Sequence, residues 1–185
     1  MPEDRIAAAP GTGASMKERL RGGVLMLLCA AMAAAIGGGL YEHIVLIPLW
    51  SASPPSSFSV IQPDTGVPQQ RFWIPVHTAI TTLLLAALFA IWKERKARRF
   101  ILIGLACYAV MRVWSAVFFI PEMLAFQRVP LDSVPTPELM ARVASWTFWT
   151  WFREPLDIAV FACFLLALFW VKKPGAGAFG EAPRP

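Results

Sequence analysis

Four long apolar stretches dominate the pattern of hydrophobic and polar positions along the chain. They cover about residues 22–50, 73–92, 100–120 and 145–171. A helix needs about 20 apolar residues to cross the ~30 Å hydrocarbon layer of a bilayer, and each stretch reaches that length. The pattern therefore predicts an all-α fold, a polytopic membrane four-helix bundle that forms a single domain over residues 16–173.

The segments outside these stretches are rich in turn-forming residues. Residues 1–15 and 174–185 contain many Ala, Gly and Pro residues, which predicts a disordered tail at each end. At Thr136-Pro137-Glu138 a capping hydroxyl precedes a proline and an acidic residue, an order typical of a helix start. We therefore expect the fourth helix to begin near Pro137, before its apolar stretch.

Charge is scarce and unevenly placed. Charged residues make up 16% of the 185 residues, against about 25% in soluble proteins. Most basic residues flank the stretches on one side: Arg5, Lys17, Arg19, Arg21, Lys93, Arg95, Lys96, Arg98, Arg99, Lys172, Lys173 and Arg184. The positive-inside rule then predicts an integral multi-pass protein of the cell (inner) membrane with both termini cytoplasmic. Membrane lipid, and not nucleic acid, is the partner that this pattern indicates.

Prolines lie toward the outer end of each stretch, at Pro48, Pro75, Pro121 and Pro155. Proline removes a backbone donor and tends to kink a helix. We therefore expect a regular, tightly packed inner half and a more irregular, open outer half.

Small residues recur every four positions in the first stretch, at Ala30, Ala34 and Gly38. Small side chains at this interval let a neighbouring backbone approach closely. The stripe indicates packing within the bundle or, alternatively, a homodimer contact.

Ionisable residues inside the stretches lie at similar depth. At ~1.5 Å per residue, Arg112, Asp157 and His77 lie about 18–22 Å from the inner interface. Arg153 and Glu154 lie at about 24–26 Å, and Glu42 near 30 Å. Because a charge inside a membrane is costly, these residues predict a functional polar cluster in the outer half of the bundle.

Helical phase and depth suggest contacts within this cluster. Arg112 and Asp157 have matching depth, so we expect them to pair. Glu122 shares a helical stripe with Arg112 and should also face inward. Glu42 and His43 diverge by about 100° as helical neighbours, and we expect Glu42 to be the one that faces inward.

The residue types suggest roles. His77 would donate or accept a proton, Arg112 would stabilise an oxyanion, and Asp157 or Glu42 would orient the site. The remaining candidates would contact a lipophilic ligand: Trp114, Glu122, Arg153 and Glu154.

No pattern typical of a cofactor or metal site is present. The sequence has no paired-cysteine motif, no Glu-x-x-His spacing and no phosphate-binding loop. We therefore expect neither metal nor cofactor. Three functions stay open: an enzyme or binder for a lipophilic small molecule, a structural or accessory membrane subunit, and a proton-coupled transporter.

Two segments also carry a family resemblance. Residues 37–41 (GGGLY) and 47–49 (IPL) in the first stretch, and residues 146–149 (WTFW) with Arg153 in the last, resemble the anthrone oxygenase-like family of small four-helix membrane proteins. The resemblance implies a four-helix membrane fold. A few members of that family are associated with cofactor-independent oxygenation of aromatic polyketides. The Asn and His usual before the family's final-helix arginine are absent here, so Arg153 is the residue that carries over.

Overall fold

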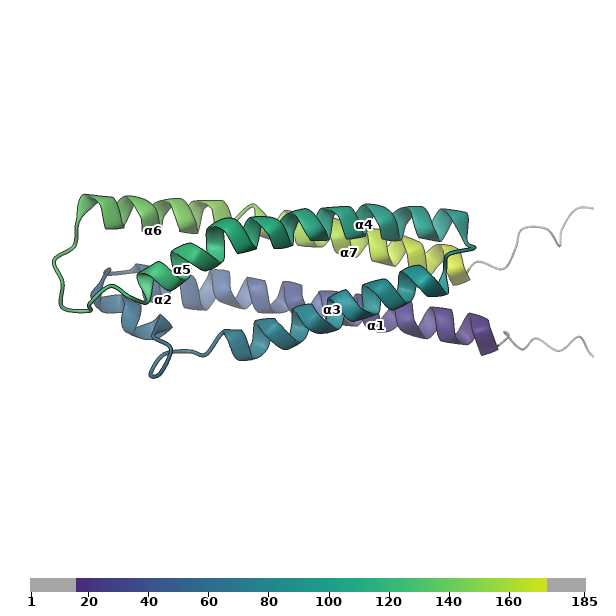
Figure 1. The fold of residues 1–185 in the computed structure, drawn as a ribbon, viewed down its shortest axis with the longest axis horizontal. Coiled ribbons are helices and arrows are strands. Elements are labelled where there is room, and N and C mark those ends of the chain that lie inside the picture. The colour runs from purple at the N-terminus through teal and green to yellow at the C-terminus, as the bar shows by residue number, and fades with distance from the viewer. Residues whose placement is uncertain (1–15, 173–185) are drawn as a thin grey trace, which may run out of the picture.

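The computed structural model describes residues 16–172, and the predicted disordered tails lie outside the described residues. Helices form most of this range, and no strand occurs within it. Four helical segments in the described part are long and apolar enough to cross a membrane: Met16–Ser51, Gln70–Ala90, Arg95–Phe126 and Pro137–Val171. They lie side by side in an elongated bundle (Figure 1).

The first segment is continuous but not uniform. It contains α1 (Met16–Tyr41), the π-helical turn η1 (Glu42–Leu46) and α2 (Ile47–Ser51). A 3-10 turn, η2 (Ser56–Ile61), lies in the following loop, and α3 (Gln70–Ala90) forms the second segment.

The third segment repeats this construction, and the fourth is broken. The third contains α4 (Arg95–Trp114), the π-helical turn η3 (Ser115–Phe119) and α5 (Ile120–Phe126). The fourth contains α6 (Pro137–Thr150) and α7 (Arg153–Lys172), separated by a turn at residues 151–152.

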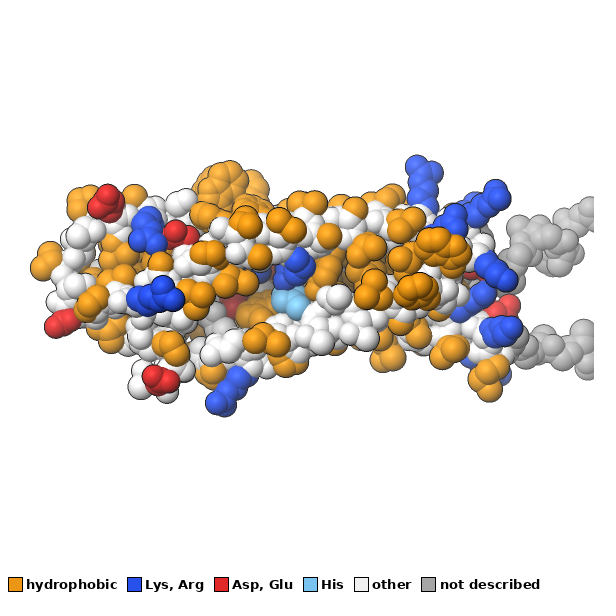
Figure 2. All heavy atoms as spheres, in the orientation of Figure 1, with side chains coloured by type: hydrophobic (Ala, Val, Ile, Leu, Met, Phe, Trp, Pro, Cys, Tyr) orange, Lys and Arg blue, Asp and Glu red, His pale blue; other side chains and the backbone are white. Residues whose placement is uncertain are grey.

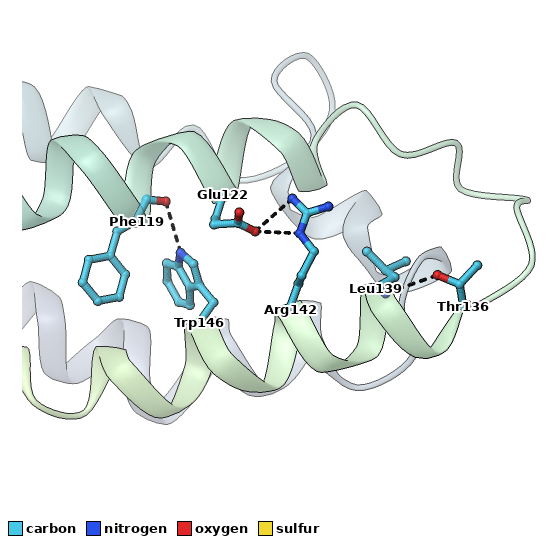
Figure 3. Close-up of polar contacts among 6 residues, drawn as sticks. All are labelled: Phe119, Glu122, Thr136, Leu139, Arg142 and Trp146. Atoms are coloured by element: carbon cyan, nitrogen blue, oxygen red, sulfur yellow. Dashed lines mark hydrogen bonds and ion pairs between the residues drawn. The ribbon is translucent and has the colours of Figure 1, made fainter.

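The predicted start of the last segment is confirmed. The Thr136 hydroxyl accepts a hydrogen bond from the Leu139 backbone N–H at 3.2 Å, and Pro137 is the first helical residue (Figure 3). This contact satisfies one of the amide groups that a helix leaves unpaired at its start.

Irregular backbone gathers in the predicted outer half. The π-helical turns lie just before Pro48 and Pro121, and Pro155 follows the break between α6 and α7. Proline cannot donate to the helical ladder, and a wider turn accommodates the missing bond. Helix α3 continues through Pro75 without interruption.

The half of the bundle where α1 begins and α7 ends, which is the predicted inner half, contains a close-packed apolar core. Helix α4 packs along α7, and α1 packs against both α3 and α7. The Phe164 ring of α7 lies directly over Gly104 of α4, where a Cβ would approach it to 2.6 Å. Buried residues in this core include Leu28, Met32, Ile80, Leu84, Ile101, Val160, Phe164 and Ala167.

A second, aromatic cluster closes the outer end. Trp50 of α2 contacts the rings of Phe58, Phe126 and Trp146, which come from three other parts of the chain. The loop after α2, the end of α5 and helix α6 are thereby joined.

The small-residue stripe of α1 is divided. Gly38 packs beneath the Phe72 ring of α3, whereas Ala30 and Ala34 are exposed on the surface of the bundle. The prediction that the stripe packs within the bundle is therefore confirmed at Gly38. A homodimer contact through this stripe stays a prediction.

Candidate functional site

A cavity of about 520 Å³ lies between the inner core and the outer aromatic cluster. Its walls come from η1, α3, the α4–η3–α5 segment, the two outer loops, α6 through Trp146 and the start of α7 through Arg153. Helices α3 and α4 make few contacts with each other, which leaves room for it. Figure 2 shows a hollow on this face, with histidine and basic side chains amid apolar surface. Its volume lies within the range of small-molecule sites.

Arg112 and His77 form the centre of the site. An Nη1 group of Arg112 donates to Nε2 of His77, and Nδ1 of His77 lies 3.1 Å from the Tyr108 hydroxyl. Because a guanidinium can only donate, Nε2 is the acceptor and the ring proton lies on Nδ1. His77 is therefore a neutral imidazole whose remaining lone pair is already occupied.

Trp73 connects this centre to Glu42. Its indole stacks on the His77 ring, with centroids 5.3 Å apart and planes 16° apart. Its indole N–H donates to the Glu42 carboxylate in η1. Glu42 thus faces α3 and lines the cavity, as expected.

Four polar atoms around the cavity have no hydrogen-bond partner among the described residues. They are Nε and Nη2 of Arg112, Oγ of Ser115 and Nε of Arg153, and all three residues line the cavity. Each guanidinium lies over an aromatic ring: Arg112 is 5.1 Å from the Tyr108 centroid and Arg153 is 4.9 Å from that of Phe119. Burial without a partner is costly for such groups, and each of them has a hydrogen to donate.

The predicted pairing of Arg112 with Asp157 is wrong. The structure records no ion pair between them, although Asp157 lies within electrostatic range of Arg112 and Arg153. Asp157 is 8% exposed and shares the buried stripe of α7 with Val160 and Phe164. Depth places the two residues at one level but does not choose the partner, and in the structure Arg112 donates to His77 and lies over the Tyr108 ring.

Glu122 and Trp114 lie outside the cavity lining. Oε2 of Glu122 accepts a hydrogen bond from Nε of Arg142 in α6 and forms an ion pair with its Nη2, at 2.9 Å each (Figure 3). Trp114 packs against Phe119 and Trp149, with centroids 5.1 and 6.0 Å away. The π-helical turn η3 explains the error for Glu122, since one extra residue in a turn rotates all later positions by about 100°.

His43 is buried, contrary to expectation. Its Nδ1 donates to the Gly39 carbonyl at 2.9 Å and lies 3.6 Å from the Glu154 carboxylate. Helix α1 packs against α3 on one side and α7 on another. Side chains that point in different directions from its end, such as those of Glu42 and His43, can therefore each contact a neighbouring helix. Glu42 meets α3 and His43 meets α7. Glu154 therefore belongs to this second contact and does not line the cavity.

Sequence reasoning missed His43 and Trp73. Trp73 looks like an ordinary interfacial tryptophan, yet it precedes His77 by four residues, the spacing at which helical side chains stack. That spacing was the available signal. For His43 the sequence offered none, because its burial depends on how α1 packs.

Two further observations bear on the site. Within residues 16–172, no three His, Cys, Asp or Glu side chains form a group that could hold a metal ion. Comparison of the chain with protein-family models, curated proteins and solved structures gives no match. The resemblance to the anthrone oxygenase-like family therefore stays a prediction.

Proposed function

We propose that this chain is a multi-pass protein of the cell membrane with both termini in the cytoplasm. Four membrane-length helices support it, as does the placement of charge. Helix α1 begins and α7 ends at the same end of the bundle, where basic side chains gather (Figures 1 and 2). By the positive-inside rule this end faces the cytoplasm, and the cavity then lies toward the outer surface.

Cysteine labelling in whole cells tests this orientation. Native Cys29, Cys107 and Cys163 are first replaced by Ala. In the proposed topology, a charged thiol reagent labels Ser133→Cys in intact cells and Lys93→Cys only after permeabilisation. The opposite pattern would contradict the orientation.

We propose further that the cavity binds a lipophilic molecule that presents an oxygen acceptor to Arg112 and Arg153. One observation carries this proposal: the four unpartnered atoms named above belong to residues that line the same cavity. A buried polar group without a partner costs about 1–3 kcal/mol. A carbonyl, enolate or carboxylate oxygen would accept the free N–H groups, and the apolar walls would accept the rest of the molecule.

The chemistry available at such an oxygen is electrostatic. Donors held in place before a reaction stabilise negative charge as it develops on an oxygen. His77 is less suited to the role of base, because the Arg112 N–H occupies its acceptor nitrogen. We therefore assign Arg112 and Arg153 to ligand contact, and His77 to holding Arg112 in position.

Native mass spectrometry of protein released from nanodiscs tests the binding proposal. We expect the parent chain to retain a small molecule and the Arg112→Gln variant to lose at least about tenfold in retention, since a charge-assisted hydrogen bond contributes about 1.5–3 kcal/mol. Arg128→Gln, at an exposed loop position, is the matched control. Equal retention in Arg112→Gln and the parent would remove the proposal.

A structural role is the second candidate, and one observation favours it. The Arg112–His77–Tyr108 contacts join α4 to α3, which otherwise touch little. A purely structural site predicts that Arg112→Gln lowers thermal stability while no molecule co-purifies with the parent chain. The same measurements therefore separate the two functions.

A further inference from the structure

The cavity has an apolar mouth on the side of the bundle. Ile74 of α3 lines the cavity and is 66% exposed, and Ile120 and Leu124 of α5 line it while 54% and 47% exposed. A side chain that belongs to both a cavity wall and the outer surface lies at the opening. An opening therefore lies between α3 and α5, and both belong to segments of membrane-spanning length. Val67, which is 43% exposed, also lines the cavity, so the rim of the opening continues onto the loop before α3.

A loop crosses the outer end of the cavity. Ile61, Pro63 and Val67 of the loop before α3 line this end. Gln127, just after α5, donates its side-chain N–H to the Ile61 carbonyl at 2.8 Å, which fastens the loop across the end. Ile61 is also buried in the outer aromatic cluster.

The loop itself is held in a fixed shape. The Val67 N–H donates to the Val60 carbonyl at 2.8 Å, and the Gly66 N–H donates to the Gln62 carbonyl at 2.9 Å. A Cβ at Gly66 would collide with the backbone of Val60 and Gln62, so glycine permits this close crossing. A ligand that enters at the outer end must pass this firmly held loop, whereas a ligand that enters between α3 and α5 need not.

We infer that the ligand is a single-chain amphiphile that enters from the bilayer through the mouth between α3 and α5. This inference rests on the binding proposal above and names its ligand class. The oxygen-bearing head lies against Arg112 and Arg153, and the hydrocarbon tail passes between Ile74 and Ile120 into the surrounding lipid. Polar groups on the cavity wall and apolar groups at its rim match the two parts of such a molecule.

Narrowing the mouth provides the test. Protein in nanodiscs is titrated with two probes that share a head, octadecenoic acid and hexanoic acid. In Ile120→Trp and Ile74→Trp, we expect at least a fivefold loss of affinity for the long probe and little change for the short one, because only the long tail must leave the cavity. Val113→Trp, at an exposed position of α4 outside the cavity lining, is the control and should bind both probes like the parent.

Each outcome has a distinct meaning. Unchanged affinity for the long probe in both variants, or equal loss of both probes, would overturn the lateral mouth and leave the head site standing. Failure of the parent chain to bind either probe would overturn the head site as well. Methyl octadecenoate, titrated beside the acid, separates a neutral carbonyl head from a carboxylate.

Discussion

The inner and outer halves of this bundle use the same helices in different ways. In the inner half, α1, α3, α4 and α7 are regular and bury apolar side chains such as Leu28 and Phe164 against one another. In the outer half, two π-helical turns and a helix break surround a cavity that leaves polar atoms unpaired. The first arrangement maximises contact, whereas the second leaves a cavity, and the binding proposal interprets this as a trade of stability for function.

The largest effect is expected in the inner half. Phe164→Ala removes a fully buried ring between α4 and α7 and should cost about 3–5 kcal/mol of unfolding free energy. Reversible unfolding in mixed micelles measures it. Phe89→Ala, at a highly exposed position of α3, should change little. Similar losses in the two variants would mean that the inner half is not the main source of stability.

The next largest effect is expected at a glycine where two helices of the inner half pack closely. Gly104→Leu forces a side chain into the Phe164 ring and should cost about 1–3 kcal/mol, because α4 and α7 must separate. Gly37→Leu is the matched control, since a Cβ there meets nothing within 4 Å. Thermal unfolding of the two variants in the same detergent gives the difference. A larger loss in Gly37→Leu would contradict the packing described for α1 and α4.

The outer half should respond in the opposite direction. Ser115→Ala removes a buried hydroxyl that has no partner and should stabilise the ligand-free protein by about 1 kcal/mol while weakening ligand retention. The satisfied hydroxyl of Ser51, which donates to the Ile47 carbonyl at 2.6 Å, supplies the contrast. Ser51→Ala should destabilise the protein by a similar amount. If Ser115→Ala and Ser51→Ala both lower the free energy of unfolding, the Ser115 hydroxyl stabilises the fold and the expectation for the cavity wall is wrong.

The smallest effect is expected at the edge of the cavity region. Glu122 and Arg142 form a partly exposed ion pair, so Glu122→Gln should change unfolding free energy by at most about 1 kcal/mol. Ligand retention should not change, because Glu122 does not line the cavity. A marked loss of ligand retention in Glu122→Gln would mean that Glu122 takes part in ligand binding.

Much of the fold followed from features that depend on local sequence. Hydropathy located all four helices of membrane-spanning length in the described residues, and Thr136-Pro137 located a helix start that the structure confirms. Counting residues along each helix also placed Glu42, His77 and Arg112 at nearby levels, and all three line one cavity. These predictions were possible because they depend only on the rise of a helix per residue and on the cost of burying polar groups.

The errors arise where the helix departs from regular geometry. Glu122 was assigned to the face of Arg112, but the π-helical turn η3 lies between them and rotates its position. Depth favours Asp157 as the partner of Arg112, whereas in the structure Arg112 donates to His77 and lies over the Tyr108 ring. Pro121 marks an irregular region but does not say which residues form the wide turn, and the order of the helices around the bundle has no mark in the sequence.

The unpaired donors in the cavity have a consequence for anyone who purifies this protein. A detergent monomer carries an oxygen-rich head on a single alkyl tail, which is the shape and chemistry of the ligand proposed above. Under that proposal, extraction in a large excess of detergent is expected to replace the native ligand with detergent. Polymer discs cut directly from the membrane avoid that exchange and are the preparation in which the native ligand should survive.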